Sequence, residues 1–138
     1  MMRKYLAASR ELEKVLQAER KNNAAMKKLI ICYTQTSRPY EALNLFYELI
    51  SRDIEIIINT DQIADDCPCP GLIGEIEVDK VRYEDTFIKF CMLGILWLYC
   101  DVSVSLRYFK KACEIDNGHT LLNQILSVYE NYVRIKPQ

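Results

Sequence analysis

The chain has 138 residues, of which 50% are hydrophobic and 27% are charged, a composition typical of one soluble globular domain rather than a disordered segment. The net charge of −1 gives no indication of a general nucleic-acid or membrane-surface binder. Only four glycines and four prolines occur, which favours long uninterrupted elements over many short strands joined by tight turns.

The charge is unevenly distributed along the chain. Residues 1–28 hold eight Lys or Arg against three Glu, a local charge of +5. Residues 53–85 hold ten Asp or Glu against two basic residues, a local charge of −8. Two solvated faces of opposite sign are the simpler interpretation, and a polarised surface that steers partners is the functional one.

Several features predict a cytoplasmic protein. The N-terminus becomes charged before the apolar core of a signal peptide could develop. The most apolar run, residues 87–100, contains Lys89 and is shorter than the roughly 20 residues that span a bilayer, so it predicts a buried helix. Four of the six cysteines lie within apolar helical patterns, where a free cysteine behaves as a small hydrophobe: Cys32, Cys91, Cys100 and Cys113. We therefore expect reduced thiols.

Residues 1–21 are predicted to form a leading helix whose pattern returns 34 residues later. The matching pairs are Ala8 with Ala42, Leu12 with Phe46, Val15 with Leu49, Leu16 with Ile50, and Glu19 with Asp53. A fixed period of this length is typical of stacked supersecondary units. The leading helix is thus predicted to be a copy of the third helix, one repeat earlier.

Residues 23–58 are predicted to form an antiparallel helix pair. Asn22 and Asn23 favour a turn before it. Pro39 suits the first position of the second helix, where its missing N–H costs nothing, and Ser37 is available as the cap. Residues 54–58 either extend that helix or form an irregular apolar segment. Apolar residues recur at three- and four-residue steps in both helices: Met26, Leu29, Ile30 and Tyr33, then Ala42, Leu43, Leu45, Phe46, Leu49 and Ile50.

Residues 59–80 are predicted to be an irregular loop insertion, because prolines and glycines interrupt regular structure there. A loop of this length within a compact domain is usually functional or locally folded. Four apolar side chains are expected to pin it across the helices: Leu72, Ile73, Ile76 and Val78.

Cys67 and Cys69 in this insertion form the obvious candidate for a metal or redox pair. Zinc sites typically take four ligands in two pairs, whereas one residue separates these thiols and no second pair follows. Asp61, Asp65 and Asp66 lack the spacing and glycine of a calcium loop. We expect a structural loop without metal or cofactor, and a thiol- or metal-dependent role at Cys67 and Cys69 is the alternative.

Residues 82–117 are predicted to form a second helix pair. Leu93 and Gly94 precede Trp97 in its first helix, and Phe109 and Ala112 stand near the end of its second. A glycine in mid-helix costs about 1 kcal/mol relative to alanine. We therefore expect a neighbouring helix to pack tightly against Gly94.

Residues 119–135 are predicted to form a closing helix. Its apolar stripe comprises Leu121, Leu122, Ile125, Leu126, Tyr129, Tyr132 and Val133. A repeat array needs a terminal helix with a polar outer face, which Asn123, Gln124, Glu130 and Asn131 would supply.

The two helix pairs resemble the tetratricopeptide repeat (TPR) family, whose unit is a helix–turn–helix of about 34 residues. The matching positions are Met26, Leu29, Tyr33, Ala42, Phe46 and Leu49 in the first copy, and Leu93, Gly94, Trp97, Phe109 and Ala112 in the second. Both copies are degenerate. Ile30 replaces the family's glycine, Ile54 its proline and Ser105 an alanine.

The resemblance implies an all-α fold in which antiparallel helix pairs stack as a short TPR-like α-solenoid. The whole chain, 1–138, is then one domain with one long loop insertion. In this family the A helices line a concave groove that holds a peptide or helix of another protein. By alignment to the repeat, the groove-facing positions are Lys27, Lys28 and Ile31 in the first pair, and Ile88, Cys91, Met92 and Ile95 in the second.

A non-catalytic scaffold or adaptor that binds a protein segment is therefore the leading functional hypothesis. No phosphate-binding loop or nucleophile motif occurs, and His119, the single histidine, stands at a helix start where a capping or solvent role is expected. Two helix pairs are fewer than the three repeats usually needed for stability. A self-associating module whose groove is a homodimer interface is therefore an alternative.

Overall fold

The computed structural model describes residues 2–61, 71–77 and 85–135. All regular secondary structure in these ranges is helical, so the all-α prediction is confirmed. The helices are α1 (Met2–Ala18), α2 (Asn23–Gln35), α3 (Pro39–Asp53), α4 (Glu55–Ile58), α5 (Gly71–Glu77), α6 (Thr86–Trp97), α7 (Val102–Ile115) and α8 (Thr120–Ile135).

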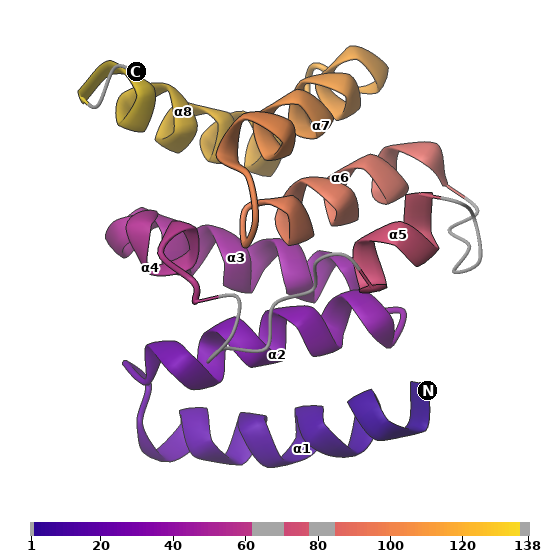
Figure 1. Ribbon diagram of the computed structural model, residues 1–138, viewed down its shortest axis with the longest axis vertical. Coiled ribbons are helices and arrows are strands. Elements are labelled where there is room, and N and C mark those ends of the chain that lie inside the picture. The colour runs from indigo at the N-terminus through magenta and orange to yellow at the C-terminus, as the bar shows by residue number, and fades with distance from the viewer. Residues whose placement is uncertain (1, 62–70, 78–84, 136–138) are drawn as a thin grey trace.

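The longer helices follow one another along the molecule, from α1 at one end to α7 and α8 at the other (Figure 1). The molecule has two halves, α1–α3 and α6–α8, and consecutive helices pack together within each. In the first half α1 packs on α2 and α2 on α3, and in the second α6 packs on α7 and α7 on α8. Helix α3 joins the halves, because it contacts both α6 and α8. The finer arrangement, a TPR-like solenoid, stays a prediction.

The helix boundaries lie close to the expected ones. The leading helix expected over 1–21 ends at Ala18, and the closing helix expected over 119–135 is α8. The pair expected over 82–117 is α6 and α7, and the pair expected over 23–58 is α2 and α3 followed by α4. Helix α4 contains Glu55 and the three isoleucines that follow it, and it begins directly after α3 with Ile54 between them.

Side-chain oxygens cap the starts of α2, α6 and α7. Asn22 Oδ1 accepts a hydrogen bond from Ala25 N before α2. Asp85 Oδ1 accepts from Phe87 N at 2.8 Å before α6. Asp101 Oδ1 accepts from Ser103 N at 3.0 Å before α7, and its hydrogen bonds with Ser103 hold its pKa below the ordinary range. Each oxygen satisfies a backbone N–H that lacks a partner within the helix.

The cap expected at Ser37 is wrong. The residue that precedes α3 is Arg38, which makes no side-chain cap bond. Ser37 instead has a φ of 58°, and Arg38 N donates to Tyr33 O at 3.3 Å across it. This is the left-handed closure that commonly ends a helix, so the backbone of Ser37 terminates α2. Pro39 does occupy the start of α3, as expected.

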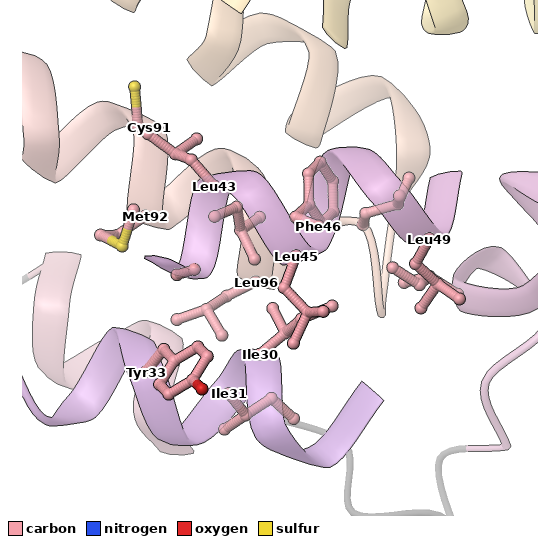
Figure 2. Close-up of a cluster of buried hydrophobic side chains, with 14 of the residues drawn as sticks. Ile30, Ile31, Tyr33, Leu43, Leu45, Phe46, Leu49, Cys91, Met92 and Leu96 are labelled. Carbon is pink, nitrogen blue, oxygen red and sulfur yellow. The ribbon is translucent and has the colours of Figure 1, made fainter. Parts of the chain in front are cut away.

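The core runs continuously through the packed helices. Figure 2 shows part of it, where labelled side chains of α2, α3 and α6 gather between their helices. Every buried side-chain nitrogen or oxygen in the described residues has a hydrogen-bond partner. Such a core, apolar and with its polar atoms satisfied, provides most of the stability of a small helical domain.

Phe109 of α7 lies at the junction of three helices. Its ring centroid is 5.7 Å from that of Phe46 in α3 and 5.6 Å from that of Tyr129 in α8. A Cβ added to Gly94 of α6 would lie 2.8 Å from three ring atoms of Phe109. The close approach expected at Gly94 is therefore present, and α7 supplies the neighbour.

The matched pairs of α1 and α3 differ in burial. Ala42, Phe46, Leu49 and Ile50 of α3 are all buried, whereas of their counterparts only Leu16 is buried and Val15 is 38% exposed. The difference follows from position, because α1 packs mainly on α2 at one end of the molecule, while α3 packs on several helices.

Candidate functional site

The apolar residues expected to line a groove are buried. Ile31 and Ile88 are 7% exposed, and Cys91, Met92 and Ile95 are fully buried. Burial also raises the pKa of the Cys91 thiol to about 12. These five side chains therefore belong to the core and line no open surface in this structure.

The two lysines predicted with them have different positions. Lys28 is exposed and Lys27 is half-buried on α2. The backbone carbonyl of Lys27 accepts a hydrogen bond from Tyr99 Oη at 2.6 Å, which connects α2 to the end of α6. This residue thus has a structural contact through its main chain.

Part of the insertion is a helix rather than a loop. The segment Gly71–Glu77 forms α5, which lies against α6 (Figure 1). Ile73 and Ile76 are buried and Leu72 is half-buried, so these residues do pin the segment to the helices. Two prolines and two glycines led to the loop prediction, and packing on α6 outweighs the low helix propensity of the glycines. Val78, the fourth residue expected to pin the insertion, lies outside the described residues.

Glu77 gives α5 a polar attachment. Its Oε2 accepts hydrogen bonds from Trp97 Nε1 at 3.1 Å and from Tyr108 Oη at 2.7 Å. Partial burial and the neighbouring carboxylate raise the pKa of Tyr108 to about 12. The end of α5 is therefore held by side chains from both α6 and α7.

A different surface is open. A cleft of about 660 Å³ lies where α1 and α3 flank α2. Three leucines, one from each helix, form its floor: Leu16, Leu29 and Leu45. Its walls are mostly charged or polar: Glu13, Gln17 and Arg20 on the α1 side, Tyr33 from α2, and Glu41, Asn44 and Glu48 on α3. The cleft combines a small apolar floor with a polar rim.

One end of the cleft is fixed by Arg38. Its Nη2 lies 3.1 Å from Glu13 Oε2, and its guanidinium pairs with Glu41 and stands 4.3 Å from the ring centroid of Tyr33. Tyr33 Oη donates to Glu13 Oε2 at 2.6 Å. Burial and the bond to Glu13 raise the pKa of Tyr33 above its ordinary value, and Arg38 holds the pKa of Glu41 below its own. The cluster thus joins α1, α2 and α3, and its contacts favour the protonated form of Tyr33 and the ionised form of Glu41.

The other end is fixed by Glu48. Its two oxygens pair with Arg20 at 2.5 Å and with Arg52 at 2.9 Å. Arg52 Nη1 also donates to Asn23 Oδ1 at 3.3 Å. These pairs are largely exposed, so each contributes little to stability by itself. The Arg20–Glu48 pair is the one of these contacts that joins the two walls.

The middle of the cleft has two amide side chains on opposite walls. Gln17 on α1 and Asn44 on α3 are both exposed. Asn44 Nδ2 donates to Tyr40 O at 2.8 Å, which orients its amide. An amide side chain presents a donor and an acceptor together, the same pair that a peptide backbone presents.

The described residues contain no group of three or more side chains suited to a metal ion. Cys67 and Cys69, with Asp65 and Asp66, lie outside the described residues. Near α8, His119 Nδ1 accepts from Leu122 N at 3.3 Å, which is the capping role expected of it.

The expectation of reduced thiols fails at one position. Cys32, Cys91 and Cys113 are free, whereas Cys100 is disulfide-bonded. Cys100 is only half-buried in the turn after α6, so another cysteine can reach its sulfur, which its apolar sequence pattern did not indicate. In the described part of the chain, none of the helices has the length and apolar character needed to cross a membrane.

Comparison with family models, with curated proteins and with solved structures gives no match to this chain. The TPR resemblance therefore depends on the residues of the two copies alone. The cleft was not predicted from the sequence, because its walls come from helices whose relative placement no local pattern specifies. A partial signal was present in Arg38 and Glu41, which are three residues apart at a helix start.

Proposed function

We propose that this protein is a non-catalytic interaction module, a scaffold or adaptor, that binds an extended segment of a partner protein in the cleft between α1 and α3. The observation that carries the proposal is the open cleft itself, with leucines beneath two opposed amides.

The wall chemistry supports a peptide as the ligand. Gln17 and Asn44 can each exchange two hydrogen bonds with a peptide backbone, and a small apolar side chain of the partner would contact Leu45 in the floor. The three wall glutamates pair with arginines, so the rim has little net charge to select a strongly charged ligand. The proposed ligand is thus a mixed apolar and polar segment.

Peptide display against the immobilised protein tests this proposal. Selected peptides are expected to lose about thirtyfold in affinity for the double variant Gln17→Ala/Asn44→Ala, because each of the two lost hydrogen-bonding groups weakens binding by about 1 kcal/mol. The matched control is Asn117→Ala/Gln124→Ala, which removes the same amide types from exposed positions that line neither cleft. A selection that yields no binders, or binders equally sensitive to both double variants, would contradict the proposal.

Self-association is the second candidate, and the exposed end of α8 favours it. Val133 is 48% exposed and Ile135 is 75% exposed. A smaller cleft of about 350 Å³ beside them is lined by Ile54 and Tyr132 among others. Light scattering at two protein concentrations separates the candidates, since a monomer at both leaves the peptide-binding proposal alone.

A further inference from the structure

Helix α5 is bound to the rest of the protein much as a separate peptide would be. It has seven residues, and α6 is the main helix with which it packs. Ile73 and Ile76 are three residues apart, so they lie on the same side of the helix, and both are buried. Glu77 follows at the end, where Trp97 and Tyr108 donate hydrogen bonds to it.

The helical form of α5 is intrinsically weak. A helix of this length is marginal in water even with good helix formers. Gly74, inside the helix, costs about 1 kcal/mol relative to alanine, and Gly71, the first residue of the helix, costs less. A Cβ added to either glycine would meet nothing within 4 Å, so packing does not require glycine at these positions. The stability of α5 therefore derives from its docking on α6.

The surface beneath α5 has a defined chemistry. It contacts two branched apolar side chains that are three residues apart, Ile73 and Ile76. Directly after them it binds the carboxylate of Glu77, to which an indole N–H and a phenol O–H both donate. Both donors come from the body of the molecule, α6 and α7, and both are present whether or not α5 is docked. A helix from another protein with the same three groups would find the same partners.

We propose that the face of α6 covered by α5, with Trp97 and Tyr108 at its end, is a helix-binding site that α5 occupies in this structure. Its second ligand is a partner helix that carries two isoleucine-like residues three apart followed directly by an acid, and this helix binds in place of α5. The site is separate from the cleft between α1 and α3, so the inference does not rest on the proposed function.

Competition between α5 and the partner sets the apparent affinity. A partner binds only the fraction of molecules in which α5 is undocked, and its apparent dissociation constant rises as that fraction falls. Replacing Gly71 and Gly74 with alanine strengthens α5 and weakens partner binding. Replacing the buried Ile73 and Ile76 of α5 weakens its docking and strengthens partner binding.

The test uses a fluorescently labelled helical peptide of about 14 residues that carries Leu-Ile-x-x-Ile-Glu, with alanine at x. The buffer is reducing, so that the disulfide of Cys100 makes no contribution. Binding is measured by anisotropy and by the fluorescence of Trp97, the single tryptophan. Ile73→Asp/Ile76→Asp is expected to bind the peptide about tenfold more tightly than the wild type, and Gly71→Ala/Gly74→Ala at least about fivefold more weakly. A control peptide with both isoleucines replaced by aspartate is expected not to bind.

Three results would overturn the proposal. The first is equal peptide affinity for the wild type and Ile73→Asp/Ile76→Asp. The second is a concentration-dependent dimer of that variant with no peptide binding, which would make the occupant a second copy of this chain. The third comes from native-state hydrogen exchange of the wild type, which remains informative if the variant does not fold. Amides of α5 are expected to exchange about tenfold or more faster than those of Cys91–Leu96, and equal rates would show that α5 is an inseparable part of the core.

Discussion

Gly94 is the residue at which the packing of α6 on α7 is most sensitive to one added methyl group. In Gly94→Ala, the new Cβ would lie 2.8 Å from the ring of Phe109, which is fully buried between Phe46 and Tyr129 and has no space to move. We expect a loss of about 2 kcal/mol in the free energy of unfolding, despite the better helix propensity of alanine. Urea denaturation measures it.

Gly118→Ala is the matched control for that substitution. The nearest atom to its added Cβ is Asp116 Oδ1 at 3.8 Å, an ordinary contact. We expect a change within about 0.5 kcal/mol. Equal stability of the two variants would show that Phe109 can move away from α6.

Ser105 has a role that an alanine could not fill. Its Oγ donates to Gly94 O at 2.5 Å and lies 2.6 Å from Tyr129 Oη, and the three groups are buried. Ser105→Ala leaves the tyrosine hydroxyl without a partner in the core, so we expect a loss of about 2 kcal/mol. In the double variant Ser105→Ala/Tyr129→Phe no hydroxyl is left unpaired, and the losses are expected to fall short of additivity by about 1 kcal/mol. Strict additivity in a double-mutant cycle would contradict this role.

The buried Tyr129 also predicts a dependence on alkaline pH. Burial raises its pKa above the ordinary value of 10.0. The neutral hydroxyl therefore contributes its full stability below that value, and the contribution is lost as pH rises above it, because the unfolded chain releases the proton first. The urea midpoint of the wild type is expected to fall between about pH 9 and pH 11. The urea midpoint of Tyr129→Phe is expected to fall less over the same pH range. Parallel curves of urea midpoint against pH for the two proteins would contradict this role of Tyr129.

At the scale of elements, the end of α2 shows how a turn residue can resist prediction. Ser37 has a φ of 58°, a conformation that costs an L-residue about 1 kcal/mol. Ser37→Gly removes that cost, and we expect the free energy of unfolding to rise by roughly 0.5 kcal/mol after the greater entropy of unfolded glycine is deducted. Thermal unfolding measures it. Ser51→Gly, in the exposed last turn of α3, is the control and is expected to lose about 0.5 kcal/mol.

The regular helices were predictable from local pattern, and the special positions were not. The stripe of α3 needs only a 3.6-residue period and Pro39 at its start. Ser37 was expected to cap α3, since serine is a good capping residue, yet the closure of α2 required its backbone instead. The segment of α5 was predicted to be a loop on account of Pro68, Pro70, Gly71 and Gly74, because the sequence does not show the surface of α6 that stabilises the helix.

The same limit applies to the candidate sites. Ile88, Cys91, Met92 and Ile95 were assigned to an open groove by alignment, and the structure places them in the core. The open cleft depends on the angle at which α1 and α3 flank α2, and that angle is set by side-chain packing between helices. Gln17 and Asn44 are 27 positions apart and carry no shared local pattern.

At the scale of the whole molecule, Phe109 joins the two halves into one cooperative core. It contacts Phe46 of α3 and Tyr129 of α8, and α3 in turn packs on α2. We therefore expect the slowest amides of α2 and of α6 to exchange at the same free energy, that of global unfolding. Phe109→Ala is expected to lower both values together by about 4 kcal/mol. The control is Phe90→Ala, since Phe90 is half-buried beside Tyr108 and away from the junction, and a smaller loss is expected. The contradicting result would be two separate exchange free energies, with only that of α6 lowered by Phe109→Ala. The halves would then fold independently, because the aromatic junction would transmit no stability from α7 to α3.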